Sequence, residues 1–120
     1  MVIRQQQFDS QQAAVVERWV TRLTAYAYDS FPVETARMGP DLTRKLARYG
    51  IARARYWNLV REDHVAGFLA MLILLSPTFD ADPEFEWAQA ILASDVPAAL
   101  RMERLWIGTD RLLRMLATTA

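Results

Sequence analysis

The chain contains no cysteine, one histidine and no apolar run long enough to cross a bilayer. The lack of cysteine excludes disulfide bonds, iron–sulfur clusters, cysteine-ligated zinc and thiol catalysis. The single histidine excludes metal sites that need two. The longest apolar segment, Val65 to Leu75, falls far short of the roughly 20 residues of a transmembrane helix. We therefore expect no cofactor, no metal ion and no membrane insertion.

What is present is a chain of 120 residues, 52% of them hydrophobic, in which 14 basic residues balance 14 acidic ones. A chain of this length buries about two-thirds of the surface that its unfolded form exposes, so it can fold as one domain without disulfides or metals. The N-terminus has no apolar signal-peptide region, which predicts a cytoplasmic protein. We expect residues 1–8 to be flexible and residues 9–120 to form a single helical domain.

Apolar residues recur at helical spacing, and no segment alternates apolar and polar residues as a strand would. The first helix is predicted to start at a cap formed by Asp9 or Ser10. It ends before a short helical turn over residues 34–38. A second long helix is predicted from Pro40 to about Leu59, because proline is tolerated at the first helical position.

The third helix begins near Glu62 and is apolar on every side, so it must be surrounded by protein. A shorter helix starts at Asp82-Pro83, and the last follows Pro97. The last helix carries an apolar row that should dock against the others: Met102, Leu105, Trp106, Thr109, Leu112, Leu113 and Leu116. The sequence therefore predicts an all-α fold, a compact single-domain bundle of about five main helices with a buried central helix.

Charge is distributed unevenly along the chain, although its sum is zero. Between Asp41 and Arg61 there are six basic residues and one acidic residue, whereas the segment from Asp80 to Asp95 holds five acidic residues and no basic one. Separate patches of opposite sign orient protein partners. The alternative is that the two segments neutralise each other within the fold. The predicted partner-binding residues are Arg44, Arg48, Arg55, Asp80, Asp82, Glu84 and Glu86.

The basic helix, residues 41–61, has a second interpretation as a nucleic-acid-binding element. Its arginines lie near Tyr49, Tyr56 and Trp57, which could stack on bases while the arginines contact phosphates. The neutral total charge argues against this function, because nucleic-acid-binding domains usually carry a net positive charge. A nucleic-acid-binding regulator remains the alternative to a protein-binding module.

Two groups of residues suggest chemistry. His64 follows Glu62 and Asp63, and a histidine beside a carboxylate can act as a general base, but no partner nucleophile is indicated. Asp80 and Asp82 could bind a divalent cation, yet the further oxygen ligands of a calcium loop are missing and a helix cap explains Asp82. We expect no enzymatic activity and no metal site.

Three motifs carry a resemblance: Phe31-Pro32, YGIARA at residues 49–54 and FDADPEFEWAQAIL at residues 79–92. Together they resemble a group of small helical bacterial proteins encoded beside type VI secretion spike, PAAR-tip and toxin genes. The resemblance implies an accessory role as adaptor, chaperone or immunity protein, with a toxin, effector or secretion spike component as the partner. The resemblance implies no catalytic residue.

The apolar face of the last helix could also pair with a second copy of the chain.

Overall fold

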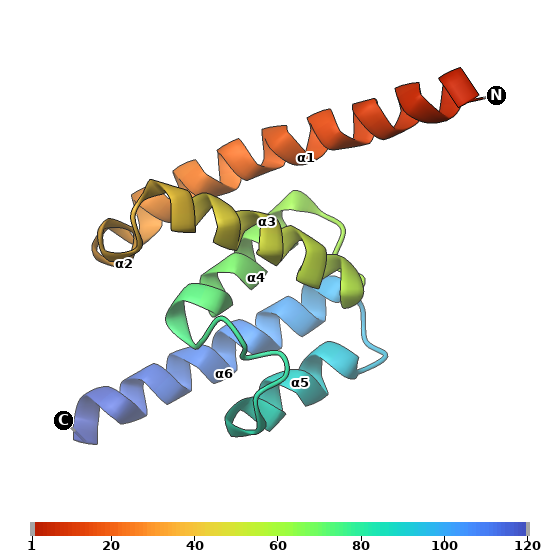
Figure 1. The fold of residues 1–120 in the computed structure, drawn as a ribbon. Helices are drawn as coiled ribbons and strands as arrows, with labels where there is room; N and C mark the ends of the chain where they lie inside the picture. The colour runs from red at the N-terminus through yellow and green to blue at the C-terminus, as the bar shows by residue number, and fades with distance from the viewer. Residues whose placement is uncertain (1, 120) are drawn as a thin grey trace.

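The computed structural model describes the backbone of residues 2–119 and the side chains of residues 10–118. Within this range the chain forms six α-helices and a short 3₁₀ helix and no strand, which confirms the all-α class (Figure 1). The elements are α1 (Val2–Ser30), α2 (Pro32–Met38), α3 (Pro40–Tyr56), α4 (Glu62–Leu74), η1 (Pro83–Phe85), α5 (Glu86–Ala93) and α6 (Ala98–Thr119). Six helices replace the predicted set of about five, because residues 32–38 form a helix rather than a single turn.

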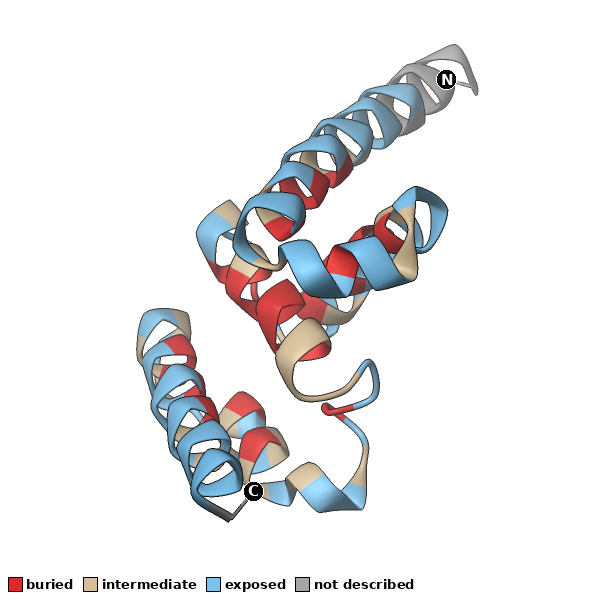
Figure 2. Ribbon diagram, turned by 90° about the vertical axis from the view of Figure 1, so that its left-hand side faces the viewer, coloured by how far each residue is buried: buried red, intermediate tan, exposed pale blue. Residues whose placement is uncertain are grey.

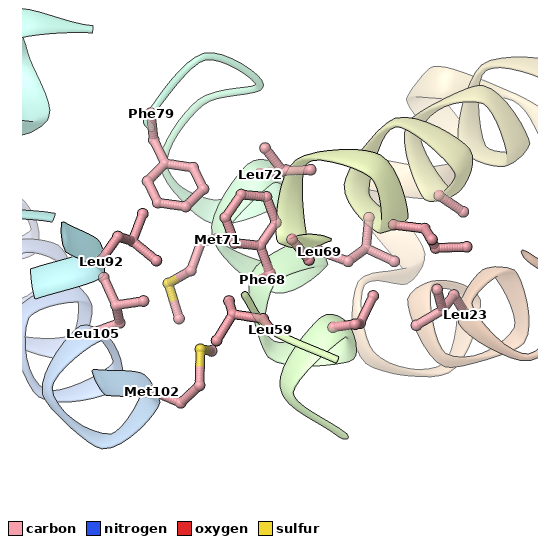
Figure 3. Close-up of a cluster of buried hydrophobic side chains, with 14 of the residues drawn as sticks. Leu23, Leu59, Phe68, Leu69, Met71, Leu72, Phe79, Leu92, Met102 and Leu105 are labelled. Carbon is pink, nitrogen blue, oxygen red and sulfur yellow. The ribbon is translucent and has the colours of Figure 1, made fainter. Parts of the chain in front are cut away.

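Helix α4 lies between two groups of helices (Figure 1). It contacts α1 and α3 on one side and α6 on the other, and α5 packs against α6. Phe68 and Met71 face the α5–α6 group, where Phe68 packs on Phe79 with ring centroids 5.1 Å apart (Figure 3). Leu69 and Leu72 extend toward α3 (Figure 3). Helix α4 is apolar on every side because it packs against both groups of helices.

The start of α1 differs from the prediction. The helix begins at Val2, so the predicted cap at Asp9 or Ser10 lies inside it and that prediction is wrong. Most of the residues before Asp9 have side chains that a helix accepts, and a single Asp or Ser costs a helix little. The predicted flexibility of residues 1–8 stays a prediction, because their side chains lie outside the described set.

Helix α3 ends at Tyr56, three residues before the predicted end at Leu59. Asn58 adopts a left-handed conformation with φ of 60°, which asparagine tolerates better than most residues. The backbone N–H groups of Asn58 and Leu59 then donate to the carbonyls of Arg55 and Ala54 at 2.9 and 2.8 Å. These two bonds form a Schellman motif, which satisfies helix-end carbonyls and turns Leu59 into the core.

The ends of α1 and α6 extend past the other helices. The radius of gyration is 15.8 Å, against about 14 Å for a compact domain of this length. Only Val16 is partly buried among residues 10–18, and only Leu112 among residues 110–118 (Figure 2). The domain therefore has a packed centre and two exposed helical ends.

Candidate functional site

Asp80 was predicted to be an exposed partner-contact residue, but it is buried, with 4% exposure. Its Oδ2 atom accepts hydrogen bonds from Arg53 Nε at 2.7 Å and from Trp57 Nε1 at 2.9 Å. Arg53 lies in the last turn of α3 and Trp57 directly follows the helix; because the two are four residues apart, they lie on the same side of its end. A buried carboxylate needs a paired cation, and the basic helix supplies it. The expectation that Asp80 belongs to an exposed acidic surface is therefore corrected: here the alternative of neutralisation within the chain holds.

The segment around Asp80 is fixed on both sides. Phe79 is fully buried. Asp82 Oδ1 accepts a hydrogen bond from the backbone N–H of Glu84 at 2.9 Å, which caps η1 as predicted. Gln89 Nε2 donates to the carbonyls of Asp82 at 2.6 Å and Phe79 at 3.2 Å. The motifs at residues 49–54 and 79–92 thus contact each other through Arg53 and Asp80. The residues that make these contacts stabilise the fold.

Two of the predicted basic contact residues are bound to α1. Arg48 Nη2 and Nε lie 2.6 and 3.1 Å from Glu17 Oε1, and Arg44 Nη2 lies 3.1 Å from Glu17 Oε2. The hydrogen bond from Arg48 is the main cause that lowers the pKa of Glu17, and the charges of both arginines add to it. Arg44 and Arg48 therefore offer a partner less positive charge than the sequence suggests.

Arg55 differs from these arginines. It is exposed, and within residues 10–118 no carboxylate pairs with it. It lines a pocket of about 230 Å³ between α1, α3 and the turn into α4. The other lining residues within 10–118 are apolar: Val15, Val16, Trp19, Ile51, Leu59, Val60 and Val65.

The acidic segment keeps a smaller exposed part than predicted. Glu84 and Glu86 are exposed and pair with no basic residue in the described part of the chain. They lie at η1 and the start of α5, next to Trp87. A Cβ placed on Gly108 would be 2.4 Å from Trp87 Cζ3, so this end of α5 rests on the middle of α6. The two acidic residues thus come one and three residues before the tryptophan that contacts α6.

The apolar row of α6 is covered along only part of its length. Met102, Leu105 and Thr109 are buried, and Thr109 Oγ1 lies 3.0 Å from Met71 Sδ of α4. Farther along, the same helical face is exposed. The large apolar side chains there are Leu113 and Leu116, exposed by 37% and 53%, with half-buried Leu112 beside them. Together with Trp106, which precedes Thr109 and is 40% exposed, they form what we call the α6 apolar surface.

The prediction that the whole row docks against the other helices is therefore wrong for its last part. The physical reason is length: α6 has 22 residues, while α4 has 13 and α5 has eight. The covering helices end before α6 does. The shortness of the predicted helix after Asp82-Pro83 was a signal in the sequence that could have indicated this exposed end.

Arg101 is a buried basic residue that sequence reasoning did not single out. It is 8% exposed, and its Nη1 donates to the carbonyls of Trp57 at 2.7 Å and Leu92 at 3.1 Å. These carbonyls lie at the carboxyl ends of α3 and α5, where helices carry partial negative charge. Arg101 of α6 thus connects the ends of α3 and α5. The two carbonyl groups take the place of a carboxylate as its hydrogen-bond acceptors. Nothing in its sequence neighbourhood distinguishes it from the exposed arginines of α6.

Of the residues considered for catalysis or metal binding, Asp80 and Asp82 make structural contacts, whereas the buried Nδ1 atom of His64 has no hydrogen-bond partner within residues 10–118. His64 is 8% exposed, with Nε2 3.9 Å from Asp63 Oδ2. Asp80 is held by α3, and Asp82 caps η1. Among the residues that the structure describes, no group of three or more histidine, aspartate or glutamate side chains could hold a metal ion. None of the described helices combines the length and the apolar character needed to span a membrane.

Comparison with known protein families, with curated proteins and with solved structures found no match for this chain. Three surface features remain as candidate sites. They are the α6 apolar surface, the acidic side chains at the start of α5, and the pocket that Arg55 lines.

Proposed function

We propose that the protein is a non-enzymatic protein-binding module whose main contact is the α6 apolar surface. One observation carries the proposal: the helix face that is buried at Leu105 and Thr109 continues, exposed, at Leu113 and Leu116. Exposed apolar surface that continues a core face is typical of protein interfaces. A partner helix laid along this end would cover it as α4 covers the preceding turns.

The exposed acidic side chains orient the partner on this surface. Glu84 and Glu86 precede Trp87, which packs on Gly108 of α6, and they have no basic partner within residues 10–118. A partner with basic residues flanking its apolar face therefore fits this end of the molecule. Asp82 belongs to the same acidic group, although one of its oxygens already caps η1. The contact residues proposed from the sequence are thus reduced on the acidic side to Asp82, Glu84 and Glu86.

The role we propose is accessory. The resemblance of the three sequence motifs supports an adaptor, chaperone or immunity-type partner of a bacterial secreted toxin or secretion component. The nucleic-acid alternative has less support, because Arg44 and Arg48 share the carboxylate of Glu17 and Arg53 is held by Asp80. Positive charge that is neutralised within the chain contributes little to phosphate binding.

The test is co-expression of the protein with the products of its neighbouring genes, followed by purification of the complex. Leu113→Lys places a charge on the α6 apolar surface and is expected to weaken the complex at least tenfold. Ile107→Lys is the matched control, since Ile107 is also exposed, at 46%, but lies on another face of the same helix. It should leave binding within about twofold.

Three outcomes would contradict the proposal. If no neighbouring gene product binds, the accessory role is wrong. If both variants weaken the complex equally, the contact is not on this face. If sedimentation shows that the chain alone dimerises and that Leu113→Lys makes it monomeric, the surface serves a second copy rather than a different protein.

A further inference from the structure

The pocket between α1 and α3 is separate from the α6 apolar surface, which lies in the other group of helices (Figure 1). Its inner wall is formed by core residues: Ile51, Leu59 and Val65 are exposed by 4%, 0% and 1%. Val15 and Val60 also line it and are exposed by 38% and 70%. The pocket therefore reaches from solvent to the core and is not a shallow dent between surface side chains.

We propose that this pocket binds a small amphipathic carboxylate, such as a medium-chain fatty acid, with its chain on the apolar lining and its carboxylate on Arg55. The volume is about 230 Å³. Apolar cavities of about 150 Å³ already take up benzene, so the space admits a larger apolar group. Apart from Arg55, the lining side chains in the described part of the chain are those of valine, leucine, isoleucine and tryptophan, which favour an apolar ligand body.

The charge of the ligand follows from the state of the arginines on α3. Arg44 and Arg48 are bound by Glu17, and Arg53 is bound by Asp80. Arg55 is the arginine of this helix that no carboxylate of residues 10–118 neutralises. A guanidinium group matches a carboxylate in shape as well as in charge, because it can donate two parallel hydrogen bonds.

A second hollow adjoins the first and brings glutamine side chains to the site. It has a volume of about 240 Å³ and shares Val15 and Arg55 with the first; its other lining residues within 10–118 are Gln11 and Gln12. Glutamine amides can donate hydrogen bonds to a carboxylate. The two hollows share Arg55, and the glutamine amides of the second lie on the same side of the site. A carboxylate held by Arg55 therefore has further hydrogen-bond donors nearby.

The test uses decanoate as the probe and decanol as its uncharged counterpart, both below the concentration at which they aggregate. Amide chemical shifts of the ¹⁵N-labelled full-length chain are followed during titration. Decanoate is expected to shift the amides of residues 15–19, 51–55 and 59–60. Arg55→Gln should weaken decanoate binding about fivefold, as expected for a partly exposed charged contact, and leave decanol binding unchanged.

Arg104→Gln is the matched control, because Arg104 is exposed on α6 and outside the pocket. It should leave decanoate binding unchanged. Val15→Trp fills the outer part of the pocket and should abolish binding of both probes, with circular dichroism to confirm that the variant is folded.

The proposal is overturned if decanoate does not bind at millimolar concentration, or if its shifts fall on the α6 apolar surface. Equal weakening by Arg55→Gln and Arg104→Gln would show that Arg55 does not hold the carboxylate. Since none of these results involves the partner of α6, they leave the proposed function untouched.

Discussion

Arg53 and Asp80, 27 residues apart in the sequence, form an ion pair in which two guanidinium nitrogens lie 2.7 Å from one carboxylate oxygen. The Asp80 side chain is 1% exposed and that of Arg53 is 29% exposed. The pair therefore joins the basic helix α3 to the acidic segment before α5 inside the protein. This contact removes one residue of each charge from the surfaces that a partner could reach.

Replacement of Asp80 should be costly. Asp80→Ala leaves the N–H groups of Arg53 and Trp57 without their acceptor and is expected to lower the free energy of unfolding by about 3 kcal/mol. Asp80→Asn keeps an acceptor oxygen and should cost less, about 1–2 kcal/mol. Urea unfolding measures both. Glu84→Gln, an exposed acidic position, should change stability by less than about 0.5 kcal/mol, and an equal loss in all three variants would refute the structural role of Asp80.

Glu17 should make stability depend on pH. The pKa of Glu17 in the folded protein lies below the ordinary value of 4.5. The contribution of Glu17 to the free energy of unfolding is therefore complete above pH 4.5 and is lost as the pH falls through the folded pKa. Glu17→Gln is expected to be less stable than the wild type at pH 7, and this difference should shrink as the pH falls below 4.5 and through the folded pKa. The difference should shrink in 1 M salt, because the pair is exposed. Thermal unfolding across this pH range measures it, and a constant difference would contradict the assignment.

Arg101 should stabilise the protein through the two helix-end carbonyls. Arg101→Met removes both hydrogen bonds and is expected to cost about 2–3 kcal/mol, whereas Arg101→Lys keeps a cation near the carbonyls and should cost about 1 kcal/mol. Arg104→Met on the exposed face of α6 is the control, with an expected change below about 0.5 kcal/mol. If Arg101→Met is as stable as this control, the bonds to Trp57 and Leu92 contribute nothing measurable.

Two glycines should respond in opposite directions to substitution by alanine. A Cβ on Gly108 would lie 2.4 Å from the ring of Trp87, which is rigid, so Gly108→Ala is expected to destabilise the protein by about 1–3 kcal/mol. A Cβ on Gly50 would lie 3.4 Å from Leu72 Cδ1, an ordinary contact. Gly50→Ala should therefore stabilise α3 by up to about 1 kcal/mol. Equal effects would show that α5 does not rest on α6 at Gly108.

The local features of the fold could be predicted because they depend on neighbours in the sequence. Helical periodicity and the lack of alternation predicted the all-α class, and Asp82-Pro83 predicted a cap that η1 does use. Helix ends were predicted less well. The start of α1 at Val2 and the left-handed Asn58 that ends α3 depend on competition between adjacent conformations of similar free energy.

The surfaces were decided by tertiary structure. The sequence alone established how many charges and apolar residues each segment carries, and on which helical face they lie. Whether Asp80 is buried, whether Arg55 is paired and where the cover of α6 ends depend on which distant segments meet and how long each helix is. The spacing of charges along the sequence does not determine those contacts, because the strength of an ion pair depends on the distance between the two groups in space. In the same way, a helix face is buried only where neighbouring helices are long enough to cover it.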